Sequence, residues 1–158
     1  MTVLPRPCHY GANYMTETGY WNSLRKLLKN RVYAWKINAN FTAGIPDWWG
    51  SGSHQDLWVE NKRIKNDGDP PAFLDLTNHD DYLTVLQQNW LVDRYNEGRN
   101  VGVLVFSKHG HVYFPGLSWQ DPISKLDFIE RAMSKKDMAE RLINILGELP
   151  IEPPSGLK

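Results

Sequence analysis

Two carboxylates and one lysine stand at a spacing that suits metal-dependent cleavage of a phosphodiester. Asp47 ends a Gly-Ile-Pro-Asp turn (44–47), and Glu60 and Lys62 follow in the apolar run 57–62. Such a run is typical of a strand, and residues two apart on a strand point to the same face. A carboxylate and an ammonium placed side by side can hold a divalent cation and face an anionic substrate. The pattern therefore predicts a compact acidic site with one basic group.

Magnesium suits this set because it binds oxygen ligands and keeps several waters, so two or three carboxylates beside a phosphate are sufficient. The cation can lower the pKa of a water and neutralise charge on the phosphate. A lysine can stabilise the transition state or help orient and deprotonate the water. The alternative is that Glu60 and Lys62 form a surface ion pair and Asp47 is a turn residue, because so short a pattern often occurs by chance. The apolar strand and the preceding glycine-proline turn favour the site.

Charge is unevenly distributed along a chain whose net charge is zero. Residues 1–65 carry nine Lys/Arg against four Asp/Glu, whereas residues 66–158 carry nine against fourteen. The basic half contains the carboxylate pattern, and a polyanion responds to local rather than net charge. Ordinary surface variation explains such an asymmetry equally well, so it supports the site only weakly.

Composition indicates one globular domain. The 158 residues are 41% hydrophobic and 23% charged, with seven tryptophans. The single cysteine, Cys8, excludes an internal disulfide and fits a reducing compartment. No apolar run approaches the roughly 20 residues that span a bilayer, and the N-terminus lacks the apolar stretch of a signal peptide. We therefore expect a cytoplasmic protein that does not enter membranes.

The periodicity predicts an alternation of helices and strands. Thr16 suits the N-cap of a helix that runs to about Lys29. Residues 82–96 form a second predicted helix, and a polar, turn-rich stretch (63–78) precedes it. The predicted apolar side of that helix consists of Leu83, Leu86, Trp90 and Leu91. Strands are predicted at 32–37, around 47–49, and at 57–62, 101–106 and 111–114, with helices near 125–132 and 135–146 that Ser124 and Ser134 cap. This order predicts an α/β fold with a small mixed β-sheet.

Segments 44–47, 58–62 and 86–90 together resemble the PD-(D/E)xK nuclease superfamily. The most similar branch is that of the virus-type replication-repair (VRR-Nuc) nucleases, which includes small phage-encoded members. The resemblance covers about residues 16–116. It implies a restriction-endonuclease-like core, an irregular N-terminal arm at 1–15 and a C-terminal helical appendix at 117–158, all in a single domain.

The resemblance also assigns roles to individual residues. In that family a glutamate on the helix before the first strand joins the metal ligands, and Glu17 matches it. The backbone carbonyl of Asn61 would be a further ligand beside Asp47 and Glu60, with Lys62 as the catalytic lysine. A glutamine before the tryptophan of the second helix is expected near the active site, which is Gln87 here. Its neighbour Gln88 competes for that role.

The function that the resemblance implies is a Mg²⁺- or Mn²⁺-dependent endonuclease that leaves a 5′-phosphate. Stand-alone members resemble branched-DNA resolving enzymes, which predicts a homodimer acting on four-way or otherwise branched DNA. The arm and the helices after 124 are the expected dimer contact, and a phage-encoded protein acting in a bacterial host is the expected source. Two alternatives remain: a site-specific homing or restriction-type endonuclease, and a non-catalytic nucleic-acid-binding module with the nuclease fold.

Several further residues are predicted contacts of lower specificity. The set that could contact DNA phosphates or backbone comprises Lys36, Arg63, Lys65, Asn38, Asn40 and Thr42. Trp48 and Trp49 could wedge against bases, although buried tryptophans are commoner in cores. A metal site built on His109 and His111 would need the Cys8-His9 pair to complete it, so histidines without a role are the preferred interpretation.

Overall fold

The computed structural model describes residues 15–38 and 42–150, and a mixed five-stranded sheet forms its centre. The strands lie in the order β1-β2-β3-β5-β6. Their bounds are β1 Tyr33–Lys36, β2 Trp48–Ser51, β3 Asp56–Arg63, β5 Val101–Ser107 and β6 Gly110–Pro115. The β1–β2, β2–β3 and β5–β6 pairs are antiparallel, and the central β3–β5 pair is parallel.

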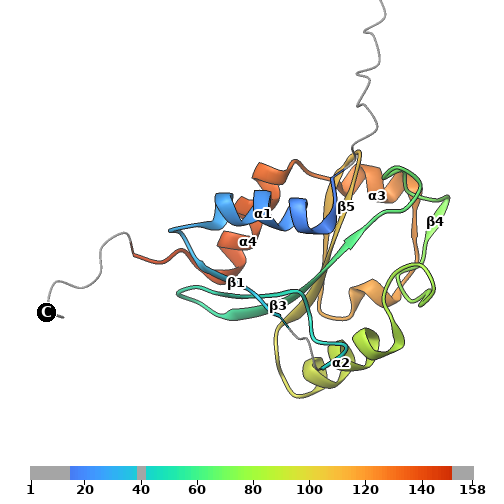
Figure 1. The fold of residues 1–158 in the computed structure, drawn as a ribbon. Helices are drawn as coiled ribbons and strands as arrows, with labels where there is room; N and C mark the ends of the chain where they lie inside the picture. Colours follow the sequence, from blue (N-terminus) through green and yellow to red (C-terminus); the bar gives the residue numbers. More distant parts are fainter. Residues whose placement is uncertain (1–14, 39–41, 151–158) are drawn as a thin grey trace, which may run out of the picture.

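Two helices cover one face of this sheet (Figure 1). They are α1 (Glu17–Leu28) and α4 (Lys135–Leu146), which contact each other as well as β1, β3 and β6. Their buried residues join one apolar cluster with inward residues of the strands: Tyr20, Trp21, Leu24, Leu28, Trp48, Val59, Phe106, Met138, Leu142 and Leu146. The C-terminal helix therefore packs into the same core as the first helix.

The opposite face carries α2 (Val85–Asn96) and a small second layer. That layer consists of β4 (Phe73–Leu74) paired with β7 (Ile123–Ser124), a short 3₁₀ helix (η1, Ser118–Gln120) and α3 (Lys125–Arg131). Its core includes Leu74, Leu83, Leu91, Val103, Val105, Phe114, Trp119 and Phe128. The elements of this face cover mainly the β3–β5–β6 side of the sheet, because α2 contacts β5 and α3 contacts β6.

The parallel β3–β5 pair explains why α2 lies where it does. Parallel neighbours need a crossover connection, and the segment between β3 and β5 contains α2. Thr84 caps this helix and forms a capping box with Gln87. The crossover therefore presents the first turn of α2 to the middle of β3.

The predicted α/β class, with a small mixed sheet flanked by helices, is confirmed. Apart from β4, the order of helix, three strands, helix and two strands is as expected. Thr16, Ser124 and Ser134 cap the helices assigned to them. None of the helices in the described part of the chain is long and apolar enough to span a membrane.

Three local predictions were wrong. The second helix begins at Val85 rather than at 82, because Thr84 takes the extended conformation of an N-cap. Leu86 was expected on its apolar side but is 54% exposed. No strand was predicted in the polar, turn-rich stretch 63–78, yet it contains β4, whose Leu74 is fully buried. A two-residue strand carries too little periodicity to be recognised from sequence.

Candidate active site

Glu60 and Lys62 lie side by side on β3, as strand alternation predicts. Lys62 Nζ is 3.0 Å from Glu60 Oε1, and Gln87 Nε2 donates a hydrogen bond of 2.6 Å to the same oxygen. Glu60 is almost fully buried, and Lys62 is largely so. One carboxylate oxygen is thus held from two elements, the strand and the first turn of α2.

Asp47 joins them from the residue before β2. The β2–β3 register pairs Trp48 with Val59, so Asp47 occupies the next position, opposite Glu60. Asp47 Oδ2 accepts a hydrogen bond of 2.8 Å from the backbone N–H of Asn61, and the Asp47 carbonyl accepts one of 2.8 Å from Ile37 N. These bonds fix Asp47 between the ends of β1 and β3.

Burial makes the site unfavourable for negative charge as it stands. The pKa of Glu60 is raised to about 8, mainly because burial removes water and also because of the nearby Asp47 charge, while Lys62 opposes the shift. The pKa of Asp47 is also raised, mainly by burial and in addition by the Glu17 charge. The hydrogen bond from Asn61 N–H opposes this shift. Ionising both desolvated carboxylates beside a single lysine would create an excess of negative charge, which a bound cation would offset.

A second observation, the state of the other Glu60 oxygen, also indicates that these residues suit a divalent cation. Glu60 Oε2 is buried and has no hydrogen-bond partner in the described part of the chain. A buried ionised oxygen without a partner is costly, so a cation on that oxygen would supply what the protein does not. Asp47 and Glu60 would hold it, since Mg²⁺ is commonly bound through one or two carboxylates together with substrate phosphate and water.

Glu17 lies near Asp47 and Glu60, but its carboxylate accepts a hydrogen bond from the backbone of β3. It begins α1, and its Oε1 accepts a hydrogen bond of 3.3 Å from Arg63 N, while its charge raises the pKa of both Asp47 and Glu60. Across residues 15–38 and 42–150, no three His, Cys, Asp or Glu side chains converge closely enough to form a metal-binding group. Glu17 as a third ligand and the Asn61 carbonyl as a fourth therefore remain predictions.

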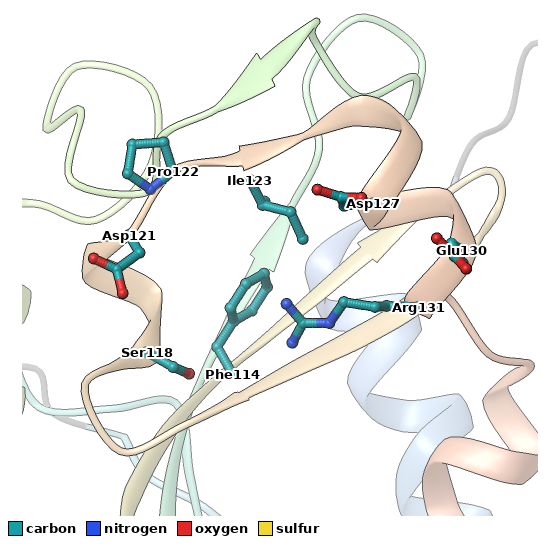
Figure 2. A pocket seen from close by; sticks show the side chains of 8 residues that line it. All are labelled: Phe114, Ser118, Asp121, Pro122, Ile123, Asp127, Glu130 and Arg131. Carbon is teal, nitrogen blue, oxygen red and sulfur yellow. The ribbon is translucent and has the colours of Figure 1, made fainter.

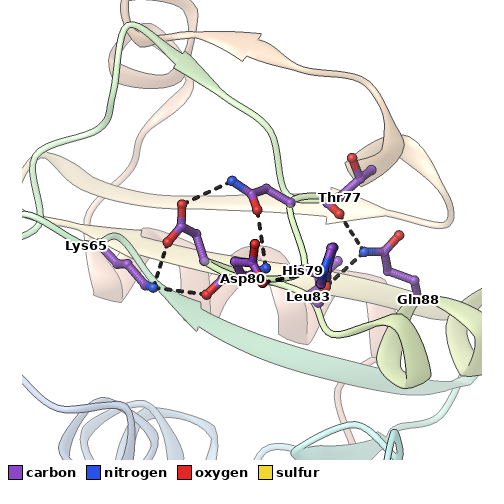
Figure 3. Close-up of polar contacts among 8 residues, drawn as sticks. Lys65, Thr77, His79, Asp80, Leu83 and Gln88 are labelled. Carbon is purple, nitrogen blue, oxygen red and sulfur yellow. Dashed lines mark hydrogen bonds and ion pairs between the residues drawn. The ribbon is translucent and has the colours of Figure 1, made fainter.

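Gln87 and Gln88, the two candidates for the glutamine near the site, make different contacts. Gln88 Nε2 donates to the carbonyls of Thr77 and Leu83, each at 2.8 Å, and so anchors the loop before α2 (Figure 3). Gln87 contacts Glu60 instead. The glutamine that reaches the carboxylates is Gln87.

The predicted DNA contacts differ in how they are placed. Lys36 is exposed and its charge lowers the pKa of Asp47, so it lies near the site. Lys65 lies in another network, since its ammonium is 2.9 Å from Asp81 (Figure 3). Asn38 is exposed and Arg63 is partly buried. Thr42 is also exposed, whereas Asn40 lies outside the described residues.

The two adjacent tryptophans lie on opposite faces of the sheet. Trp48 is fully buried against α1 and donates its indole N–H to Asn61 Oδ1 at 3.0 Å, so it is a core residue rather than a wedge. Trp49 is partly buried on the face that carries Glu60, with its ring 6.4 Å from that of Trp58. Sequence reasoning singled out Trp49 but missed Trp35 and Trp58 beside it, because their proximity depends on strand register.

The histidines of the β5–β6 hairpin have separate surroundings. His109 contacts Asp69 at 3.1 Å, whereas His111 is largely buried near the ring of Tyr20. They form no metal-binding group with the described residues, and Cys8 and His9 lie outside those residues.

A pocket of about 470 Å³ lies apart from the carboxylates, between β6, η1, β7 and α3 (Figure 2). Its lining residues are Phe114, Ser118, Asp121, Pro122, Ile123, Asp127, Glu130 and Arg131. The Arg131 guanidinium lies 5.0 Å from the centre of the Phe114 ring. None of the residues that the sequence assigned to the site lines this pocket.

Comparison with protein-family models gives no match, and comparison with curated proteins gives none either. Among solved structures, the chain is similar to Hjc from Archaeoglobus fulgidus, described as a Holliday junction resolvase from an archaeal hyperthermophile. The two are 14% identical, with a TM-score of 0.49, over 77% of this chain and 96% of that chain. A likeness at this level assigns neither a family nor an activity to the present chain.

Proposed function

We propose that this protein is a Mg²⁺- or Mn²⁺-dependent nuclease that hydrolyses phosphodiester bonds in DNA. The observation that carries the proposal is the state of Glu60: one oxygen is held by Lys62 and Gln87, and the other is buried without a hydrogen-bond partner in the described residues. Asp47 stands beside it at the matching register position. A carboxylate prepared in this way suits a cation and a phosphate more than it suits a structural role.

Each residue has a distinct task in this hydrolysis. Asp47 and Glu60 would hold the cation, which supplies Lewis acidity toward the phosphate and a water of lowered pKa. Gln87 fixes the orientation of the Glu60 carboxylate through its amide N–H. Lys62 would orient the attacking water and stabilise negative charge on the phosphate oxygens. Water attacks phosphorus, the P–O3′ bond breaks, and the products are a 5′-phosphate and a 3′-hydroxyl.

The finer substrate assignment rests on the sequence resemblance. We propose an endonuclease acting on branched DNA as a homodimer, so that two sites cut paired strands. The competing assignment is a site-specific homing or restriction-type endonuclease. A four-way junction and a linear duplex of equal length separate the two, because a site-specific enzyme would cut the duplex at one sequence whether or not a junction is present.

A cleavage panel tests the proposal directly. Linear, nicked, flapped and four-way DNA are incubated with Mg²⁺, Mn²⁺ or EDTA. Asp47→Ala and Lys62→Ala are each expected to lower cleavage by about 100-fold or more, the scale of a lost acid-base or electrostatic group, while circular dichroism stays unchanged. Lys108→Ala, a lysine of the β5–β6 turn paired with Asp69, is the matched control and should leave cleavage unchanged.

The contrary outcome is equally clear. If the wild-type protein cleaves none of these DNA forms with either metal, the nuclease proposal is wrong. A protein that then still binds DNA would be the non-catalytic binding module. The intact set of Asp47, Glu60 and Lys62 argues against that module, because a fold kept only for binding has no use for two desolvated carboxylates facing a polyanion.

A further inference from the structure

Three tryptophans stand in one row across the antiparallel strands. In the register of the sheet, Trp35 of β1 is opposite Trp49 of β2, and Trp49 is opposite Trp58 of β3. Residues directly opposite one another in a sheet share a face, so the three indoles lie on the same side. Trp49 and Trp58 have ring centres 6.4 Å apart, which confirms this for the inner pair.

The row continues onto α2 and remains accessible at its outer end. The Trp58 ring lies 5.5 Å from that of Trp90, and the Arg94 guanidinium lies 5.9 Å from the Trp90 ring. At the other end Trp35 is 63% exposed, and Tyr33, two residues before it on the same strand face, is 57% exposed. Trp49 and Trp58 are partly buried. The aromatic surface is thus supported from α2 and open toward the edge strand β1.

This row borders the candidate active site. Trp58, Glu60 and Lys62 alternate along β3 and share its face, and Asp47 precedes Trp49 by two residues. Two residues of strand span about 6.6 Å, so the tryptophan row and the carboxylate row are neighbouring lines of side chains on one surface. That spacing is close to the distance between successive phosphates of an extended nucleic-acid strand.

The side chains of this surface indicate which kind of ligand it would bind. A large exposed indole on an edge strand is unfavourable in water, and an aromatic partner would remove that cost. Lys62 lies on the same face of β3 as Trp58, and Lys36, at the end of β1, is close enough for its charge to lower the pKa of Asp47. Both ammonium groups suit a phosphate bound at the carboxylates. Aromatic faces flanked by basic groups bind single-stranded nucleic acid, because every base has a face to stack and the backbone is anionic. In a duplex both faces of each base are already stacked on neighbouring bases.

We propose that Trp35, Trp49 and Trp58 form a stacking platform for unpaired bases next to the scissile phosphodiester. The inference rests on the proposed nuclease function and deepens it: the preferred DNA has a single-stranded segment beside the cleaved bond. Trp35 is the outer contact of the platform, and Trp90 with Arg94 supports its inner end.

Binding without cleavage tests the platform by itself. Fluorescence anisotropy in EDTA compares labelled oligo(dT) with a blunt duplex of the same length. Wild type is expected to bind the single strand more tightly. Trp35→Ala should weaken single-strand binding by about 5- to 100-fold, the range of one base-aromatic stack, and change duplex binding by less than about twofold. Trp35→Tyr, which keeps a ring, should restore most of the affinity.

Phe73→Ala is the matched control, because Phe73 is a 74% exposed aromatic residue of β4 outside the row. It should leave both affinities unchanged. The platform would be overturned if Trp35→Ala weakened single-strand and duplex binding equally. It would also be overturned if Phe73→Ala weakened single-strand binding as much as Trp35→Ala does. So would a concentration-dependent dimer that Trp35→Ala converts to monomer with single-strand binding intact, because the occupant would then be a second copy.

The two proposals fail separately. A wild-type protein that cleaves DNA, with single-strand binding unaffected by Trp35→Ala, keeps the nuclease function and refutes the platform. A protein whose single-strand binding depends on Trp35 but which cleaves nothing keeps the platform and refutes the nuclease. Thermal unfolding of Trp35→Ala and Trp35→Tyr confirms that each variant is folded before its affinity is compared.

Discussion

Gln87 Nε2 donates a hydrogen bond of 2.6 Å to Glu60 Oε1, and the same glutamine closes the capping box of α2. One side chain therefore begins the crossover helix and orients the most buried carboxylate of the site. Its amide group has two parts with two uses: the oxygen accepts from Thr84 N at 2.9 Å, and the nitrogen donates to Glu60.

The two uses of Gln87 can be separated by substitution. Gln87→Glu keeps the capping box, since glutamate serves at that position, but it replaces the donor to Glu60 with a second carboxylate. We expect cleavage to fall by about 10- to 100-fold, the usual effect of losing a partner that orients a metal ligand. The melting temperature should fall as well, because the added carboxylate lies against the buried Glu60. Cleavage rates and thermal unfolding are measured on the same preparation.

Gln88→Ala is the matched control for that substitution. Its loss removes two hydrogen bonds to the loop before α2, so stability should fall by about 1–2 kcal/mol while the cleavage rate of the folded protein stays within about twofold. A larger effect on cleavage in Gln88→Ala than in Gln87→Glu would reverse the roles assigned to the two glutamines.

Gly44 sets the path of the loop that delivers Asp47. Its φ is +91°, and a Cβ there would lie 2.7 Å from the Leu86 carbonyl oxygen. Gly44→Ala should therefore destabilise the protein by about 1–3 kcal/mol and lower cleavage, because the backbone must move away from α2 and carry Asp47 with it. Urea unfolding and the cleavage assay report the two effects.

Gly98→Ala is the control that separates backbone strain at a positive φ from displacement of the Asp47 loop. Gly98 has a similar φ of +83°, but a Cβ there meets nothing within 4 Å. It should lose stability through the backbone conformation alone, with cleavage unchanged. If Gly98→Ala impairs cleavage as much as Gly44→Ala does, the loop argument is wrong.

His111 makes stability depend on pH. Burial, together with the charge of Lys135 on α4, lowers the pKa of His111 from 6.5 to about 4, and the Tyr20 ring of α1 lies 5.0 Å from the imidazole. Between these pH values the unfolded chain binds a proton that the folded protein does not. Stability contributed by neutral His111 is therefore complete above pH 6.5 and is lost as pH falls toward 4, by at most about 3 kcal/mol because the ring is partly exposed.

Urea unfolding across this pH range tests the assignment. His111→Gln should flatten the pH dependence between 4 and 6.5, whereas His79→Gln, an exposed histidine, should leave it as in wild type. An unchanged slope in His111→Gln would show that other groups carry the acid sensitivity.

Leu142 tests whether α4 belongs to the packed core. It is fully buried between α4, α1 and the sheet, so Leu142→Ala should cost about 2–5 kcal/mol in the free energy of unfolding. Lys136→Ala on the exposed side of the same helix should cost no more than about 0.5 kcal/mol. Equal and small effects would mean that α4 is detachable from the core.

Sequence reasoning reached those parts of the site that follow from local geometry. Glu60 and Lys62 are two apart on a strand, so their proximity needs only the strand assignment. Asp47 follows a turn that can be read from Gly-Ile-Pro. Gln87 and Gln88 are neighbours on a helix, and which of them meets Glu60 depends on how α2 crosses β3. The tryptophan row was out of reach, because Trp35, Trp49 and Trp58 are brought together by the pairing of three strands.

The bond between Trp48 and Asn61 has a consequence for specificity of assembly. A slip of one residue between β2 and β3 would turn Asp47 and Trp49 toward the helices α1 and α4, and the core would receive a carboxylate in place of an indole. The buried indole N–H has its partner in Asn61 Oδ1 only in the native pairing, and Gly50 leaves just enough room for Leu146 at the same place. Packing on the buried face of β2 thus allows only one register between β2 and β3. That register also sets the positions of Asp47 and Glu60 on the opposite face of the sheet.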